Sequence, residues 1–425
     1  MKIAVIGTGI AGNVAAHQLH RSHDITVYEA AGHVGGHTHT HRIELDGEVQ
    51  HVDTGFIVFN RRTYPTFDDL LTQLGVASHE SSMSFSVRNE GSGLEYNGTS
   101  LNGLFAQRTN LLRPGFLRML AEIARFNREA PKLLGAGGDE IALGDYLAMH
   151  AYSLRFRDDY LVPMAAAIWS TDPQRMLAFP ARFLVRFMHN HGMLTVNARP
   201  TWRVISGGSA RYVERLVAPW RRRIRLNCAV RQVRRACDGV WVSAHGAPPA
   251  RYDHVFFACH ADEALRLLAD PSPAEREILG ALPFQPNEAV LHTDTALLPR
   301  RRRAWAAWNY HVLAEAGQRV ALTYNMNLLQ GLTSRHTFCV TLNRSDAVDP
   351  ARVLQRIAYR HPVFTPQGVA AQRRHAEISG VARTHYCGAY WRYGFHEDGV
   401  ISALQAVGRF EQGHHDAQRP LSRVA

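Results

Sequence analysis

The chain has 425 residues, 46% of them hydrophobic and 20% charged, a composition typical of a globular protein with a large core. No apolar run approaches the roughly 18 residues that a membrane-spanning helix needs, which argues against an integral membrane protein. The formal net charge is +11. No recognition motif accompanies this charge, so the sequence does not indicate nucleic-acid binding.

The five cysteines are scattered and form no C-x-x-C pair, so neither a redox dithiol nor a cysteine zinc site is expected. Reduced thiols of this kind are typical of cytosolic proteins. The chain opens directly on a strand and a turn, without a leader pattern. We therefore expect a cytoplasmic location.

The first thirty residues predict a βαβ unit that binds a dinucleotide. "IAVI" (3–6) is a short apolar run typical of a buried parallel strand, and "DITVYE" (24–29) predicts a second strand that ends in an acid. Between them, "GTGIAG" places Gly7, Gly9 and Gly12 in G-x-G-x-x-G spacing before a helical pattern. The first glycine permits the tight turn, the second lets the backbone approach a pyrophosphate, and the third packs helix on strand. Glu29 is positioned to accept hydrogen bonds from a ribose.

A histidine-rich hairpin follows this unit. Asp46-Gly47 lies between two polar-apolar runs and predicts a two-residue turn. We expect His37, His39 and His41 on one face of the first hairpin strand. Side chains at i, i+2 and i+4 spread over roughly 13 Å, too far for one ion to bind all three, so no metal site is expected.

The stretch "EAAGHVGGHT" after the second strand resembles an element of the flavoprotein amine oxidase and phytoene desaturase superfamily, with histidines in place of two arginines. Within this superfamily, the motifs of the chain are most similar to those of a bacterial branch of predicted NAD/FAD-binding proteins. The resemblance extends to "DTGF" (53–56), to Gly207-Gly208 before a helix, and to "HYCGAYWRYGFHEDGV" near the end. It implies a non-covalently bound FAD that runs along the glycine turn and ends at the last helix, whose positive end stabilises reduced flavin.

The motif and the resemblance together give the expected cofactor-binding residues, which cluster in five places. They are Gly7, Gly9, Ile10, Ala11, Gly12, Glu29, Ala30, His33, Gly35, Gly36, His37, Thr38, Gly55, Phe56, Val230, Gly388, Glu397, Asp398, Gly399 and Val400. No second strand-GxGxxG-helix unit occurs, so we expect electrons to come from the substrate and not from nicotinamide.

The remaining segments predict a helical cap and a second sheet. A hairpin pattern at "MSFSVRNEGSGLEYNG" precedes three helical patterns, and four strand patterns follow Ser272. The expected fold is mixed α/β: a Rossmann-like FAD-binding domain (1–80, 201–265 and 380–425) interleaved with a substrate-binding domain (81–200 and 266–379) of mixed sheet plus helical cap.

The sequence identifies the catalysed reaction less clearly than it identifies the cofactor. Many amine oxidases of this fold place a lysine beside the flavin, whereas lysine occurs here only at Lys2 and Lys132. Hydride transfer requires mainly a C–H bond held in place with water excluded. We therefore expect an FAD-dependent oxidoreductase acting on a hydrophobic acyl or isoprenoid chain, as a desaturase or double-bond isomerase. Pocket candidates are Tyr324, Tyr390 and Trp391. An amine oxidase, or a non-catalytic flavin-binding partner protein, remains an alternative, and the sequence identifies no electron acceptor.

The arginine run "PRRRRAWAAW" (299–308) admits two interpretations. Arginine beside tryptophan suits an anionic membrane surface, which would place the protein peripherally at the inner membrane face. The alternative is a solvated turn between two strands.

Overall fold

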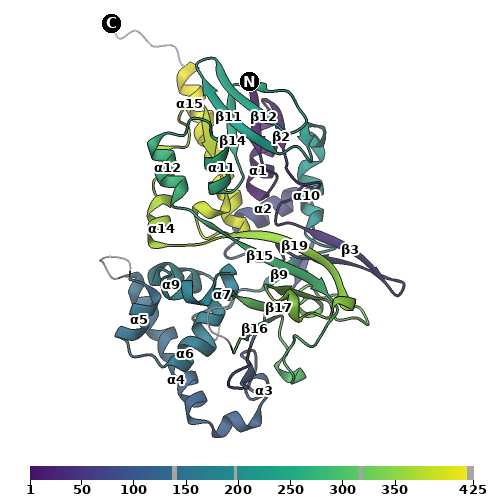
Figure 1. Cartoon of the computed structure of the whole chain (residues 1–425), viewed down its shortest axis with the longest axis vertical. Coiled ribbons are helices and arrows are strands. Elements are labelled where there is room, and N and C mark those ends of the chain that lie inside the picture. The colour runs from purple at the N-terminus through teal and green to yellow at the C-terminus, as the bar shows by residue number, and fades with distance from the viewer. Residues whose placement is uncertain (136–140, 196–198, 315–318, 419–425) are drawn as a thin grey trace.

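The computed structural model describes residues 1–135, 141–195, 199–314 and 319–418 (Figure 1). One half is built on a parallel five-stranded sheet in the order β10-β2-β1-β14-β20. Its strands are β10 (Ile224–Arg225), β2 (Asp24–Tyr28), β1 (Lys2–Ile6), β14 (His254–Phe257) and β20 (Thr384–Tyr386). The expected apolar run forms the central strand, because a strand covered on both faces carries apolar residues at every position.

The two faces of β1 contact different layers. Ile3 and Val5 pack in one hydrophobic cluster with helices α1 (Ile10–Leu19), α2 (Pro65–Gln73), α10 (Ala210–Val217) and α15 (His396–Gln418). Ala4 and Ile6 pack on the opposite face. That layer is the antiparallel sheet β11 (Val230–Ala236), β12 (Gly239–Ala244) and β13 (Ala250–Tyr252), with α11 (Ala261–Leu267), α12 (Pro273–Gly280) and α14 (Pro366–Gln372). This alternation is the period-two rule of a strand.

The second half contains a seven-stranded mixed sheet. Its order is β19 (Val353–Pro362), β15 (Phe284–His292), β18 (Cys339–Leu342), β17 (Ala321–Asn325), β16 (Trp308–Val312), β7 (Phe85–Asn89) and β8 (Glu95–Asn97). The four strand patterns expected after Ser272 correspond to β15, β16, β17 and β18, and the expected hairpin is β7–β8. The longest strand, β19, was not predicted, because its polar sequence carries little apolar alternation.

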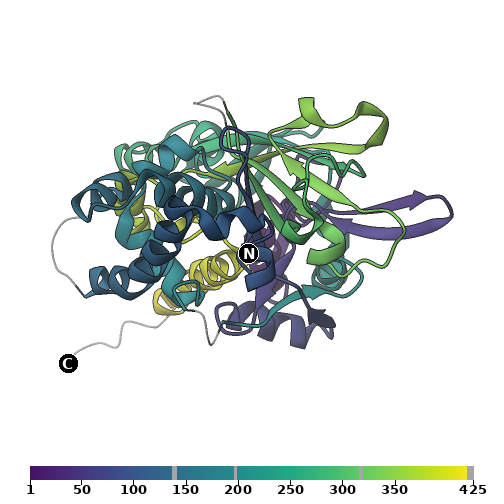
Figure 2. The ribbon, with the colours of Figure 1, turned by 90° about the horizontal axis from the view of Figure 1, so that it is seen from below.

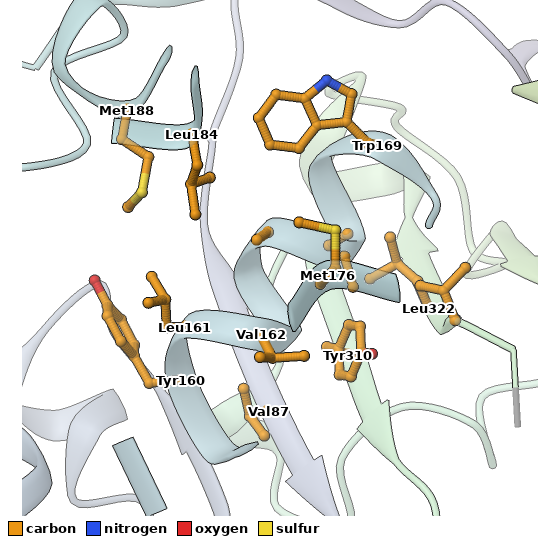
Figure 3. Close-up of a cluster of buried hydrophobic side chains, with 14 of the residues drawn as sticks. Val87, Tyr160, Leu161, Val162, Trp169, Met176, Leu184, Met188, Tyr310 and Leu322 are labelled. Atoms are coloured by element: carbon orange, nitrogen blue, oxygen red, sulfur yellow. The ribbon is translucent and has the colours of Figure 1, made fainter. Parts of the chain in front are cut away.

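Helices cover one side of this sheet, as Figures 1 and 2 show. They are α3 (Leu101–Leu104), α4 (Pro114–Glu129), α5 (Leu143–Met149), α6 (Leu154–Phe156), α7 (Val162–Trp169), α8 (Pro173–Leu177) and α9 (Ala181–Asn190). A wide turn of π type at Arg157–Leu161 precedes Pro163. Figure 3 shows the core between helices and sheet, where Val162 lies beside Tyr310 of β16 and Met176 lies near Leu322 of β17.

Two small sheets complete the described chain. The hairpin β3 (Thr40–Leu45)–β4 (Glu48–Asp53) turns at Asp46-Gly47, both with positive φ, as the sequence predicted. The expected strand position of His37 and His39 was wrong, because β3 begins only at Thr40. Strands β5 (Val58–Asn60), β9 (Trp202–Ile205) and β6 (Ser78–Glu80) form the other sheet, and α13 (Met326–Leu329) follows β17.

Candidate active site

A single large cavity of about 1410 Å³ runs from the carboxyl end of the parallel sheet into the space beneath the helical cap. This volume exceeds the roughly 300–1,000 Å³ of an ordinary small-molecule site. It therefore offers room for a cofactor and a substrate side by side. The expected cofactor-binding residues that line it are Gly7, Gly9, Ile10, Ala11, Glu29, Ala30, Gly35, Gly36, His37, Gly55, Phe56, Val230 and Gly388.

The glycine turn leaves a bare backbone surface at one end of the cavity. Gly7 adopts φ +102°, which favours glycine. A methyl group on Gly9 would meet no atom within 4 Å, so this residue borders open space. On Gly12, by contrast, a methyl carbon would lie 2.0 Å from the carbonyl oxygen of Gly7. Gly12 is thus the glycine of close helix packing, and Gly9 is the one beside the cavity.

The carboxylate of Glu29 is held firmly at the end of β2. One oxygen accepts hydrogen bonds from the backbone N–H of Thr8 at 2.9 Å and from its hydroxyl at 2.5 Å. The other oxygen accepts from the N–H of Ala31 at 2.8 Å. Each carboxylate oxygen can accept two hydrogen bonds, so acceptor capacity remains on the cavity side. This arrangement suits a ribose diol.

His37 lies where the cavity passes between the two halves. Its ring is 5.0 Å from that of Tyr359, 5.2 Å from His361 and 6.2 Å from His260, measured between centroids. Burial, together with the smaller effect of the neighbouring His260 imidazole, lowers the pKa of His37 to about 4. Burial also lowers the pKa of His260 to about 4 and that of His361 to about 3. These imidazoles are therefore neutral at pH 7, and the Nε2 atom of His37 has no protein partner.

The last helix, α15, begins at the cavity with His396. Its ring stacks on Phe56 at 3.4 Å between centroids, and its Nε2 lies 3.0 Å from both the Thr38 and Tyr212 hydroxyls. Those two hydroxyls are 2.6 Å apart. His396 is buried, and burial lowers its pKa well below the ordinary value. A neutral ring thus joins α15 to α10 and to the glycine segment.

The two acids that follow are engaged with the protein. Glu397 accepts hydrogen bonds from the backbone N–H groups of Thr66 and Phe67, at the start of α2, at 3.0 and 2.8 Å. Asp398 accepts from the N–H of Phe395 and from Arg392. The two carboxylates therefore cap the N-termini of α2 and α15.

Several expected cofactor residues do not reach the cavity wall. Thr38 belongs to the hydroxyl network described above, and the ring of His33 stacks on that of His39 at 4.1 Å. The other residues outside the lining are Gly12, Glu397, Asp398, Gly399 and Val400. A cofactor role for these residues stays a prediction that rests on the resemblance.

Asp53 joins three segments beneath this region. Its carboxylate accepts hydrogen bonds from the backbone and hydroxyl of Ser209, from the hydroxyl of Thr40 and from the side-chain amide of Gln330. The side chain is fully buried, and burial raises its pKa to about 6. Asp53 thus fixes the Gly207-Gly208 turn, at the start of α10, against the β3–β4 hairpin.

Beyond the glycine turn the cavity widens into an apolar chamber under the cap. Its walls come from the helices and from the second sheet. The aliphatic and aromatic lining residues are Met83, Phe85, Tyr96, Leu104, Leu120, Ile123, Tyr160, Met164, Ile168, Trp169, Phe187, Met193, Trp202, Trp308 and Tyr324. Within the described chain the lining holds no lysine, and its two carboxylates, Glu29 and Glu263, belong to the half built on the parallel sheet. We call that half the cofactor half, because most of the expected cofactor-binding residues lie there.

Of the three pocket candidates, Tyr324 and Tyr390 line the cavity. Trp391 does not, because it packs in the core with His375 at 4.4 Å between ring centroids. No sequence pattern indicated that His37 would lie near His260, His361 and Tyr359, because these residues come from segments far apart in the chain. Thr8 and His396 lay inside quoted motifs, and only the structure shows their partners.

The histidines of the hairpin region divide into two groups. His39 stacks between His33 and His41, with centroid distances of 4.1 and 4.0 Å, whereas His37 faces the cavity. Across the described residues, no group of three or more histidine, cysteine or acidic side chains is arranged to hold a metal ion. In those residues no helix is long and apolar enough to cross a membrane.

The parallel sheet with its glycine turn, joined to a mixed sheet and a helical cap, is the architecture of one class of flavin-dependent oxidoreductases, the amine oxidase type. The chain belongs to the family of flavin containing amine oxidoreductases, whose family model matches residues 10–304. The expected superfamily and fold class are confirmed.

Relatives and solved structures agree with this assignment. The flavin-dependent L-tryptophan oxidase RebO from Lentzea aerocolonigenes is 28% identical over 182 residues, which are 43% of this chain and 37% of that protein. Cyclohexylamine oxidase from Brevibacterium oxydans superposes with a TM-score of 0.72 at 16% identity, covering 97% of this chain and 99% of the other. A CLA-producing fatty acid isomerase from P. acnes gives 0.66 at 15% identity, covering 96% and 98%. At identities this low, the two structural superpositions establish a shared fold and nothing more.

Proposed function

We propose that this flavoenzyme binds FAD non-covalently and removes a hydride from a hydrophobic substrate, such as an acyl or isoprenoid chain. The observation that carries this proposal is the continuous cavity, which joins the glycine turn to an apolar chamber whose lining has no lysine among the described residues. A desaturase or double-bond isomerase fits such a chamber.

The residues present fit the cofactor. Gly9 leaves room for a pyrophosphate, Glu29 offers acceptors to a ribose, and the Nε2 atom of His37 is buried without a protein partner. When bound, FAD supplies the isoalloxazine ring that accepts the hydride. Burial raises the pKa of the Cys259 thiol, which lines the cavity, so this cysteine is not a thiolate that would attack the flavin.

The protein's own contribution is binding and exclusion of water. Trp169, Trp308 and Tyr324 form flat apolar walls on which an extended chain can lie. Such walls hold the reacting C–H bond in one place and keep the chamber dry. Among the described residues the chamber has no carboxylate to pair with a substrate ammonium group, because the two acids in the lining come from the cofactor half.

An amine oxidase is the second candidate, favoured by the family match and by the aromatic lining. Tryptophan and tyrosine faces attract a cation without any carboxylate. This alternative predicts the same cofactor and differs only in the donor.

Anaerobic reduction of the purified flavoprotein separates the candidates. We expect the flavin absorbance to bleach with a lipid that carries an acyl or isoprenoid chain. Bleaching with amines and not with lipids would favour the amine oxidase. An isomerase returns the hydride to the substrate and leaves the flavin oxidised, so the recovered lipid is also analysed for a shifted double bond. A flavin that no donor bleaches, with lipid recovered unchanged, would indicate a non-catalytic flavin-binding protein.

A pair of variants locates the substrate. Ile123 on α4 lines the chamber, so Ile123→Trp should fill it and slow lipid bleaching at least tenfold with flavin content unchanged. Ala121 lies on the exposed surface of the same helix, and Ala121→Trp is the matched control that should behave as wild type. Equal effects of the two variants would refute binding in this chamber.

A further inference from the structure

Four exposed leucines occur within residues 101–117, on α3, on the short helix Arg108–Leu112 and at the start of α4. Leu101 is 77% exposed, Leu112 86%, Leu111 50% and Leu117 43%. We call the surface formed by residues 99–118 the cap face. It lies at the end of the molecule opposite the N-terminus in Figure 1, and Figure 2 looks at that end. Single exposed leucines are ordinary, but a continuous group marks an interaction site.

The exposed charge around these leucines is mostly positive, although Arg118 pairs with the buried carboxylate of Glu122 at 3.2 Å. Arg108, Arg113 and Arg118 lie in the same stretch, and residues 96–121 contain no aspartate or glutamate. The short helix at Arg302–Ala304 packs beside α3, which brings Arg300–Arg303 next to the cap face. All four of these arginines are exposed. The cap face and its border are therefore strongly positive.

The cavity reaches the same place from inside. Gly98 and Thr99, just before Leu101, line the cavity and are also exposed. Leu104 of α3 and Leu120 of α4 line it as well. The two helices thus present leucines outward and form part of the chamber wall inward.

We propose that the cap face docks the protein on an anionic lipid bilayer, so that an acyl or isoprenoid chain passes from the bilayer into the chamber beside Thr99. This inference rests on the proposed function, because it names the source of its substrate. The leucines enter the region between headgroups and acyl chains, and the arginines contact lipid phosphates. A second copy of the chain does not suit this face, since the same arginines would oppose one another.

Flotation of the intact flavoprotein with vesicles tests the docking. We expect binding to phosphatidylcholine vesicles that contain phosphatidylglycerol at low salt, weaker binding at high salt, and little binding to phosphatidylcholine alone. Replacing Arg108 and Arg113 by glutamine should weaken binding to the anionic vesicles about fivefold per arginine. The double variant Leu101→Ser, Leu112→Ser should weaken it about tenfold or more.

Matched controls lie on the cofactor half. Arg221 and Arg222 are exposed arginines there, and Val381 is a 54% exposed apolar residue. Arg221→Gln with Arg222→Gln, and Val381→Ser, should float as wild type. Unchanged flavin absorbance and melting temperature in each variant show that the fold is intact.

Three results would overturn the docking proposal. The wild type stays with the soluble fraction at low salt, the control variants lose as much binding as the cap-face variants, or the protein dimerises in a way that Leu112→Ser abolishes. The proposed function fails separately. If the protein floats through the cap face but no lipid bleaches the flavin or is recovered with a new or shifted double bond, the docking proposal is retained and the proposal of hydride removal is refuted. If lipid in detergent bleaches the flavin but the protein does not float with vesicles, the proposal of hydride removal is retained and the docking proposal is refuted.

Discussion

Substituting alanine for Gly9 and, separately, for Gly12 should give opposite results, although the two glycines belong to one motif. Gly9 has φ −63° and ψ 178°, which alanine adopts freely, and its added methyl group meets no protein atom within 4 Å. Alanine restricts the unfolded chain, which stabilises by about 0.4–1 kcal/mol, but it is a poorer N-cap than glycine by a similar amount. The free energy of unfolding of apo Gly9→Ala should therefore stay within about 1 kcal/mol of wild type.

Flavin binding should respond differently. The methyl group of Gly9→Ala occupies the space where backbone approaches the pyrophosphate, and loss of one or two charge-assisted hydrogen bonds costs about 2–3 kcal/mol. The dissociation constant for FAD, measured by flavin fluorescence quenching, should rise about 30- to 150-fold.

Gly12→Ala places a carbon 2.0 Å from the Gly7 carbonyl oxygen, so α1 must shift and the fold should lose about 3 kcal/mol. Urea unfolding of the apo proteins measures this loss. Gly9→Ala with wild-type affinity for FAD would refute the assignment of this end of the cavity to the cofactor.

Three further outcomes are expected. Asp53→Ala removes the carboxylate and leaves the buried hydrogen-bond donors of Ser209 and Gln330 without an acceptor. The free energy of unfolding, measured by thermal unfolding, should therefore fall by about 3 kcal/mol. The control Glu44→Ala, at an exposed position of the same hairpin, should change little. Burial lowers the pKa of His292 to about 4 and that of His311 to about 3. Below pH 6.5 these two imidazoles therefore bind protons in the unfolded chain while they stay neutral in the folded chain. Stability should fall as pH drops from 7.5 to 5.5, by about 1.4 kcal/mol for each fully buried imidazole; equal urea midpoints at the two pH values would contradict this. Chelator treatment should leave the flavin bound, and acid denaturation should release all of it as free FAD; stoichiometric metal lost with activity, or flavin left on the precipitate, would show the respective expectation to be wrong.

Much of the cofactor half could be predicted from the sequence because its determinants are local. The turn at Gly7 and Gly9, the acid at Glu29 and the Asp46-Gly47 hairpin each depend on residues within a short window. The family assignment followed from several such windows in order. These features appear in the structure where the sequence placed them.

The rest could not be predicted because it depends on tertiary contacts. His37 was expected on a strand, but the strand begins at Thr40 and His37 packs against Tyr359 and His361 of β19. Trp391 looked like a pocket residue by its type and position, yet packing buries it in the core. No local pattern reveals which aromatic side chains border a cavity and which fill a core.

The order of strands in the parallel sheet has a consequence for synthesis of the protein. The central strand β1 pairs with β2 and β14, and β14 is completed only by β20 at Thr384–Tyr386. At roughly 5–20 residues per second, about 20–80 s separate the emergence of Ala4 from that of Thr384. From the emergence of Phe257 to that of Thr384, about 6–25 s at the same rate, the nascent chain carries an unpaired edge on β14, and α15 is not yet available to cover α1. The cofactor half therefore becomes complete only after nearly the whole described chain has left the ribosome, and we expect the flavin to be loaded after that point.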